Sequence, residues 1–139
     1  MFNTILLQEK ETVIYVFHET LDKVDVDGVI NYIITKGIST RTKYSIFDIR
    51  KLTDKTIEHQ IMEYASQQMK QNNFPGNRLI ALYTNTPDQV VLSHIFEDSI
   101  KNQPFSVKIF STFEALADWI NIPDFSEKEY EDIISRVQE

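Results

Sequence analysis

The chain has 139 residues, no cysteine, and a net charge of −7 from 14 basic and 21 acidic residues. This length fits about one domain, and 42% hydrophobic with 25% charged residues is typical of a globular protein. An acidic chain repels phosphate backbones, so general binding to nucleic acids or anionic membranes is disfavoured. The lack of cysteine excludes disulfides, thiolate nucleophiles and zinc ribbons. We read neither a signal peptide nor a membrane-spanning segment, and therefore expect a cytoplasmic protein.

The first half of the chain predicts a hairpin, a helix and a central strand. Residues 3–9 and 12–18 are rich in strand-forming types, and the short polar link between them predicts a β-hairpin. Apolar residues at helical spacing then predict a helix that ends near Gly37. Segment 44–50, YSIFDIR, is short and apolar, as expected of a central strand that is covered on both faces.

The second half alternates between helices and strands. Thr53 and Asp54 can cap a helix that ends at residues 72–76. Two further strands are expected at 78–84 and 105–110. Three helix starts are indicated by the cap and proline of Thr86-Pro87-Asp88-Gln89 and by two capping boxes, Ser111-Thr112-Phe113-Glu114 and Ser126-Glu127-Lys128-Glu129. The last helix has a single apolar stripe, Tyr130, Ile133, Ile134 and Val137.

This order of elements predicts an α/β fold. Alternating strands and helices from Tyr44 onward form right-handed βαβ units, and the hairpin adds an antiparallel edge. We therefore predict a single mixed, mostly parallel five-stranded sheet with helices packed on it. Residues 1–122 would form this domain, and residues 123–139 an appended amphipathic helix. The stripe of that helix packs either on its own sheet, which is the default, or on a second copy of the chain in a homodimer.

The sequence contains none of the motifs that indicate catalysis or cofactor binding. The three histidines, His18, His59 and His94, lack a short metal-ligand spacing. Segment 22–28 resembles the start of a calcium loop, but the twelfth position of that frame is Ile34 instead of Glu. The three glycines are isolated, so there is neither a P-loop nor a dinucleotide fingerprint. We predict no catalytic residue, no metal, no cofactor, and a protein that is not an enzyme.

Asp48 and Arg50 lie on the same face of the predicted central strand, where a charged group needs a partner. The structural interpretation is a local ion pair or a capping role at the carboxyl edge of the sheet. The functional interpretation is a binding crevice, because ligands of open α/β sheets gather at that edge.

Three segments carry a family resemblance: IFDIR (46–50), LIALYT (79–84) and FSTFEALADWI (110–120). Together with the hairpin and the alternating elements, they resemble the STAS or SpoIIAA-like family, the α/β fold of anti-anti-sigma factors. The chain is most similar to the bacterial branch that is related to CRAL-TRIO lipid-binding domains. The resemblance covers about residues 1–122 and implies a non-catalytic regulatory or protein-interaction domain. The lipid-binding branch implies the alternative, a carrier or sensor of a small apolar, lipid-like ligand.

The resemblance directs attention to two groups of residues. Phospho-regulated members carry an Asp-Ser-Ser/Thr-Gly segment at a helix N-terminus, and this chain has none. The nearest helix start, residues 52–56, offers two threonines that either cap the helix or accept a phosphate at its positive end. The expected partner-contact or switch surface is Asp48, Arg50, Thr53 and Thr56. The expected apolar pocket, whose residues fit a filled core equally well, is lined by Tyr64, Tyr83 and Phe96.

Overall fold

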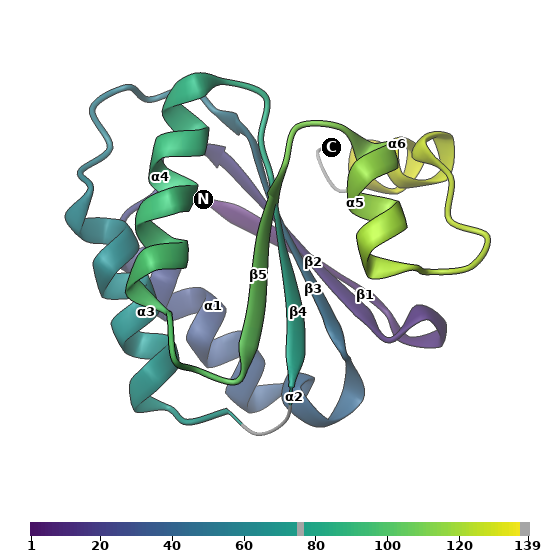
Figure 1. Cartoon of the computed structure of the whole chain (residues 1–139), viewed down its shortest axis with the longest axis horizontal. Helices are drawn as coiled ribbons and strands as arrows, with labels where there is room; N and C mark the ends of the chain where they lie inside the picture. The colour runs from purple at the N-terminus through teal and green to yellow at the C-terminus, as the bar shows by residue number, and fades with distance from the viewer. Residues whose placement is uncertain (75–76, 137–139) are drawn as a thin grey trace.

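The computed structural model describes residues 1–74 and 77–136. Five strands form one sheet in the order β1-β2-β3-β4-β5 (Figure 1). The antiparallel hairpin is β1 (Phe2–Leu7) and β2 (Thr12–Glu19), and the strands that continue parallel to β2 are β3 (Tyr44–Leu52), β4 (Arg78–Tyr83) and β5 (Phe105–Phe110). The mixed, mostly parallel sheet with an N-terminal hairpin, predicted from the sequence, is confirmed.

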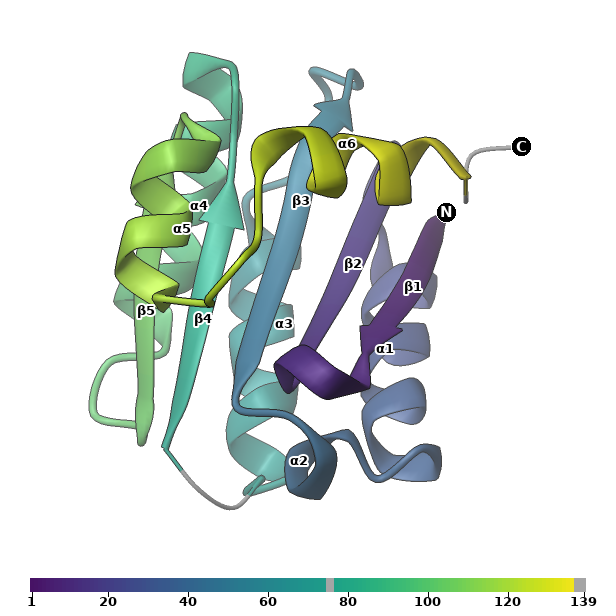
Figure 2. The ribbon, with the colours of Figure 1, turned by 90° about the vertical axis from the view of Figure 1, so that its right-hand side faces the viewer.

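Helices cover both faces of the sheet (Figure 2). One face carries the helices that connect the parallel strands, α1 (Lys23–Thr35), α3 (Gln60–Gln71) and α4 (Pro87–Ser99). They share this face because every connection has the same hand. The other face carries α5 (Phe113–Ile120) and α6 (Glu127–Arg136). Two short elements complete the chain, η1 (Gln8–Lys10) in the hairpin turn and α2 (Ile38–Arg41) after α1.

The alternation of side chains along β2 divides the interior into two apolar clusters. Val13, Tyr15 and Phe17 face the α1–α3–α4 layer, whereas Ile14 and Val16 face α5 and α6. None of the five side chains is more than 5% exposed. A strand with two buried faces reads as a continuous apolar run, which is why this segment appears in the sequence without polar interruptions.

Three helix starts follow from local capping. Gln89 and Thr86 form the reciprocal capping box of α4, with Pro87 at the first helical position. The cap of α5 is Thr112, whose hydroxyl accepts from the backbone N of Ala115, so the predicted box at Ser111 is displaced by one residue. The hydroxyl of Ser126 accepts from the backbone N of Glu129 at the start of α6.

The helix after β3 begins later than the sequence predicts. α3 starts at Gln60, and residues 53–59 form a loop. The prediction that Thr53 and Asp54 cap this helix is therefore wrong. The Asp54 carboxylate instead accepts from the backbone N and the hydroxyl of Thr56, at 2.8 and 2.6 Å, and this local turn competes with a helix start. Residues 75–76, part of the segment predicted to end the helix, lie outside the described residues.

The C-terminal helix α6 packs on the sheet of its own chain, where it crosses β2 and β3 (Figure 2). Tyr130 and Ile134 are 0% and 1% exposed, and Ile133 is half-buried. Val137, the fourth residue of the predicted stripe, lies outside the described residues. Within the described part of the chain, every helix is too short or too polar to cross a membrane.

Candidate functional site

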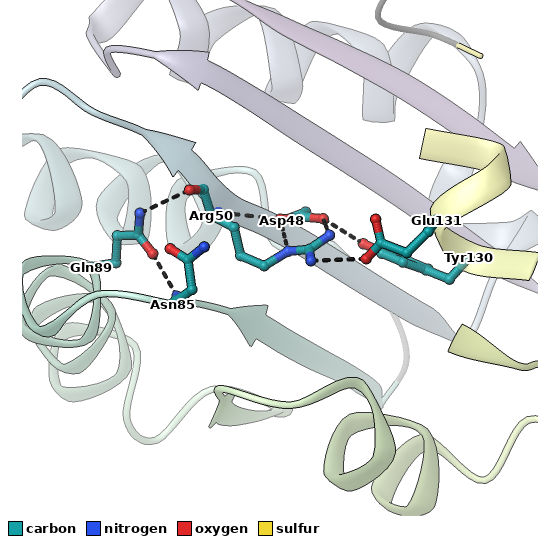
Figure 3. Close-up of polar contacts among 6 residues, drawn as sticks. All are labelled: Asp48, Arg50, Asn85, Gln89, Tyr130 and Glu131. Atoms are coloured by element: carbon teal, nitrogen blue, oxygen red, sulfur yellow. Dashed lines mark hydrogen bonds and ion pairs between the residues drawn. The ribbon is translucent and has the colours of Figure 1, made fainter. Parts of the chain in front are cut away.

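The buried ion pair between Asp48 and Arg50 lies on β3, on the face that α6 covers. Nε and Nη2 of Arg50 donate to the two carboxylate oxygens of Asp48 at 3.0 and 2.8 Å (Figure 3). The backbone N of Arg50 also donates to Asp48, at 3.2 Å. Because Asp48 is only 1% exposed, this bidentate pairing supplies the partner that a buried carboxylate requires.

Two side chains of α6 complete this cluster, which we call the Asp48 bridge: Asp48, Arg50, Tyr130 and Glu131. The Tyr130 hydroxyl donates to Asp48 Oδ2 at 2.9 Å, and Nη1 of Arg50 donates to Glu131 Oε1 at 2.9 Å. The guanidinium group also lies 4.0 Å from the centre of the Tyr83 ring, a cation–π contact. The bridge therefore joins α6 to the middle of the sheet through groups that satisfy one another.

Burial and charge shift two pKa values in this bridge. Burial, followed by the charge of Asp48 and the hydrogen bond to it, raises the pKa of Tyr130 well above its usual value. Burial alone would lower the pKa of Arg50, but the hydrogen bonds and charge of Asp48 outweigh it, so that pKa is raised. A neutral phenol and a charged guanidinium are thus the stable forms of these two groups.

Gln89 links α4 to the end of β3, beside the Asp48 bridge (Figure 3). Its Nε2 donates to the carbonyl oxygens of Arg50 and Leu52, at 3.2 and 3.1 Å. Its Oε1 accepts from the backbone N atoms of Asn85 and Thr86, at 2.7 and 3.2 Å. The sequence indicates Gln89 only as a helix cap, because the carbonyl groups it binds on β3 are distant in the chain.

Thr53 and Thr56 lie away from the Asp48 bridge, in the exposed loop between β3 and α3. The backbone N of Thr53 donates to the carbonyl of Glu19, and Thr20 Oγ1 donates to Asp54 Oδ2 at 2.9 Å. These hydrogen bonds attach the loop to the end of β2. Hydrogen bonds from Thr56, together with the one from Thr20, lower the pKa of Asp54. The four predicted surface residues therefore fall into a buried pair and an exposed pair.

A groove of about 420 Å³ opens at the carboxyl edge of the sheet, between the start of α1 and the loop that precedes α3. We call it the edge groove. Its lining combines apolar side chains with acidic ones and two hydroxyl groups: Thr20, Leu21, Asp22, Lys23, Val24, Asp54, Thr56, Ile57, Glu58 and Ile61. It contains Thr56, one of the predicted switch residues, and is held by the Thr20–Asp54 hydrogen bond described above.

An apolar cavity of about 60 Å³, which shares Leu21 with the edge groove, lies between the sheet and the α1–α3–α4 layer. Phe96 lines it, but the other two predicted pocket residues do not. Tyr64 donates its hydroxyl to Asp27 at 2.6 Å on the surface, and Tyr83 belongs to the cluster on the opposite face of the sheet. The cavity is well below the roughly 300 Å³ of a typical ligand pocket.

Arg78 is another buried charge. It lies at the amino end of β4, the end of the sheet opposite the edge groove. It is 6% exposed, and it donates to the carbonyl and hydroxyl oxygens of Thr42 and to Ser45 Oγ. Burial lowers the pKa of Arg78. Helices α1, α3 and α4 run back against the strands, so their negative C-terminal ends lie at this end of the sheet and favour a cation. We interpret Arg78 as a structural residue.

Within residues 1–74 and 77–136, no three His, Asp or Glu side chains are grouped to hold a metal ion. No model of a known protein family matches the chain, and no curated protein is significantly similar to it. Among solved structures, the chain is similar to the anti-sigma factor antagonist SpoIIAA in its unphosphorylated form. The TM-score is 0.54 at 15% sequence identity, and the match covers 89% of this chain and 100% of SpoIIAA. The chain therefore has the SpoIIAA-like, STAS-type fold that the sequence resemblance indicates.

Proposed function

We propose that this chain is a non-catalytic regulatory domain that acts by binding another protein through the edge groove. The fold supports this proposal, since SpoIIAA is an antagonist of an anti-sigma factor. The observation that carries it is Val24, which is 78% exposed at the rim of the groove. Val24 extends the apolar lining of Leu21, Ile57 and Ile61 to the surface, and an apolar patch rimmed by polar groups is typical of a contact surface.

Within this proposal, the buried and exposed pairs have different roles. Asp48 and Arg50 hold the end of β3 in place, and Thr53 and Thr56 lie on the loop that a partner would touch. A phosphate on Thr56 would replace the hydrogen bond to Asp54 with repulsion between two negative groups, and would change the wall of the groove. The chain lacks the usual phospho-acceptor segment, so partner binding in our proposal does not require a phosphate.

The alternative function is a carrier or sensor of a lipid-like ligand. The apolar cavity supports it, but about 60 Å³ is too small for an acyl chain, and its expected lining residues lie on two faces of the sheet. We therefore place this function second. Native mass spectrometry of freshly purified protein tests the ranking, because a copurifying apolar compound would reverse it.

The test of the main proposal is a pull-down from cells of the native host, where we expect the domain to act in the cytoplasm. Wild-type chain should retain a specific protein and Val24→Lys should lose it. Thr56→Glu should change the amount retained, because it disturbs the hydrogen bonds between residue 56 and Asp54 in the wall of the groove. Val91→Lys is the matched control, since Val91 is also an exposed valine, 48% exposed on α4 and outside the groove. If no protein is retained specifically, or if all three variants retain it equally, the proposal is wrong.

A further inference from the structure

The edge groove presents apolar side chains on both walls and on its floor. Val24 stands exposed on the α1 side, and Ile57 and Ile61 are half-buried on the side of the loop and α3. Leu21, only 7% exposed, lines both the groove and the apolar cavity beneath it. The apolar surface therefore continues from the rim into the interior, where the flexible side chains of Met62 and Met69 can adjust to an inserted group.

The charged groups of the groove are mostly negative. Asp22, Asp54 and Glu58 contribute three carboxylates, against the single ammonium group of Lys23. Hydrogen bonds from Thr56 and Thr20 lower the pKa of Asp54 and so favour its charged form. Lys23 Nζ lies 5.1 Å from the centre of the Tyr64 ring, so its charge is directed toward α3. The rim of the groove is thus complementary to a cation.

The start of α1 does not reverse this preference for cations. A free helix N-terminus attracts anions through its backbone N–H groups. Here the carboxylate of Asp22 accepts from the backbone N of Asp25, and Asp25 accepts from the backbone N of Asp22. This capping box occupies the end of the helix. The charge of Asp25 is balanced by the N-terminal ammonium group of Met1 at 2.8 Å, so the carboxylate of Asp22 is the one that an incoming anion would meet in the groove.

We propose that the edge groove binds a short segment of a partner protein in which Lys or Arg stands next to a branched or aromatic apolar residue. The apolar side chain would pack on Val24 and point toward Leu21, and the cation would pair with Glu58 and Asp54. This inference rests on the proposed function and specifies the chemistry of the partner.

The experiment is a selection from a random peptide display library with the whole chain as bait, followed by titration of the selected synthetic peptides. Selected peptides should combine a basic residue with Leu, Ile, Phe or Trp within a few positions. Val24→Lys should weaken their binding by about tenfold or more, because it removes apolar contact and adds like charge. Val91→Lys, the matched exposed valine on α4, should change binding less than about twofold.

Charge reversal tests the second half of the proposal. Glu58→Lys should weaken peptide binding by about threefold to tenfold and reduce its dependence on salt. Glu9→Lys makes the same charge change at an exposed glutamate in the hairpin turn, η1, and should leave the affinity unchanged. Thermal melts of the four variants confirm that each is folded at the temperature of the titration.

Several outcomes would overturn the inference. Selection of acidic or phosphate-mimicking peptides would show that the groove prefers anions, and equal binding by Val24→Lys and Val91→Lys would show that peptides bind elsewhere. Self-association that is lost in Val24→Lys would identify a second copy of the chain as the occupant. None of these results would by itself contradict the proposed function, which the pull-down tests. A native partner whose binding requires Val24 but which lacks a basic, apolar segment would support the proposed function and contradict the chemistry proposed for the partner.

Discussion

Two aspartates on the same stretch of chain contrast a buried site with an exposed one. Asp48 is 1% exposed, and its partners are the charged Arg50 and the hydroxyl of Tyr130 on α6. Asp54 lies in the surface loop, and its partners are the hydroxyls of Thr20 and Thr56. Each oxygen of both carboxylates accepts at least one hydrogen bond, but only the removal of Asp48 would leave a buried hydroxyl, that of Tyr130, without its partner. Burial, more than the number of hydrogen bonds, separates a residue that holds the fold from one that shapes a surface.

The largest difference between the two sites should appear on removal of the carboxylates. Asp48→Ala should lower the free energy of unfolding by about 3 kcal/mol, because it removes the buried partner of both Tyr130 and Arg50 and leaves Arg50 with only the more exposed Glu131 as counter-ion. Asp54→Ala should leave the midpoint of urea denaturation close to that of the wild type. Equal midpoints for the two variants would contradict the distinction drawn here.

Gln89 extends the buried site toward α4, and its replacement should have the next largest effect. Gln89→Leu keeps the volume but leaves the carbonyl groups of Arg50 and Leu52 unpaired, at a cost of about 2–3 kcal/mol. Urea denaturation measures it. Gln68→Leu, a half-exposed glutamine on α3, serves as the control, and a comparable loss there would show that the effect is not specific to the link.

Tyr130→Phe isolates a single hydrogen bond of the Asp48 bridge. It should cost about 1.5 kcal/mol, since the lost bond reaches a charged acceptor, and Tyr64→Phe on the surface should cause no resolvable change. The two variants should also differ at alkaline pH. The folded-state pKa of Tyr130 is raised above the ordinary value of 10.0, so its stabilising contribution is complete below that pH and is lost as pH rises through the raised pKa. Above about pH 10, the free energy of unfolding measured by denaturation should therefore fall less steeply with pH for Tyr130→Phe than for the wild type.

The smallest effect concerns Asp54, and it is measured by NMR titration of its carboxyl carbon. Thr56→Ala should move the pKa of Asp54 up toward its ordinary value, and by more than Thr20→Ala does, because the hydrogen bond from the Thr56 hydroxyl contributes most to the lowering. A lowered folded-state pKa means that the stabilisation is present above the unfolded pKa and is lost as pH falls through the folded one. A titration curve unaffected by Thr56→Ala would contradict this account of the loop.

Local patterns in the sequence determine much of this protein. The five strands, the hairpin and the cap at Thr86 follow from residues that are neighbours in the chain, because alternation and capping act within a few positions. The pairing of Asp48 with Arg50 is predicted for the same reason, since residues two apart on a strand share a face. The resemblance to STAS domains depends on this order of elements, and the structure agrees with it at the level of the fold.

The tertiary structure decides what lies between distant segments. Only the folded chain brings Tyr130 and Glu131 onto the bridge, and only it places Tyr83 and Phe96 on opposite faces of the sheet. Alternation along β4 separates Leu82 from Tyr83, but which face α4 covers depends on the hand of the crossover. The start of α3 also escapes the sequence, because the carboxylate of Asp54 has two uses, a helix cap or a turn joined to β2. The neighbouring strand selects the second use, and the loop so formed becomes one wall of the edge groove.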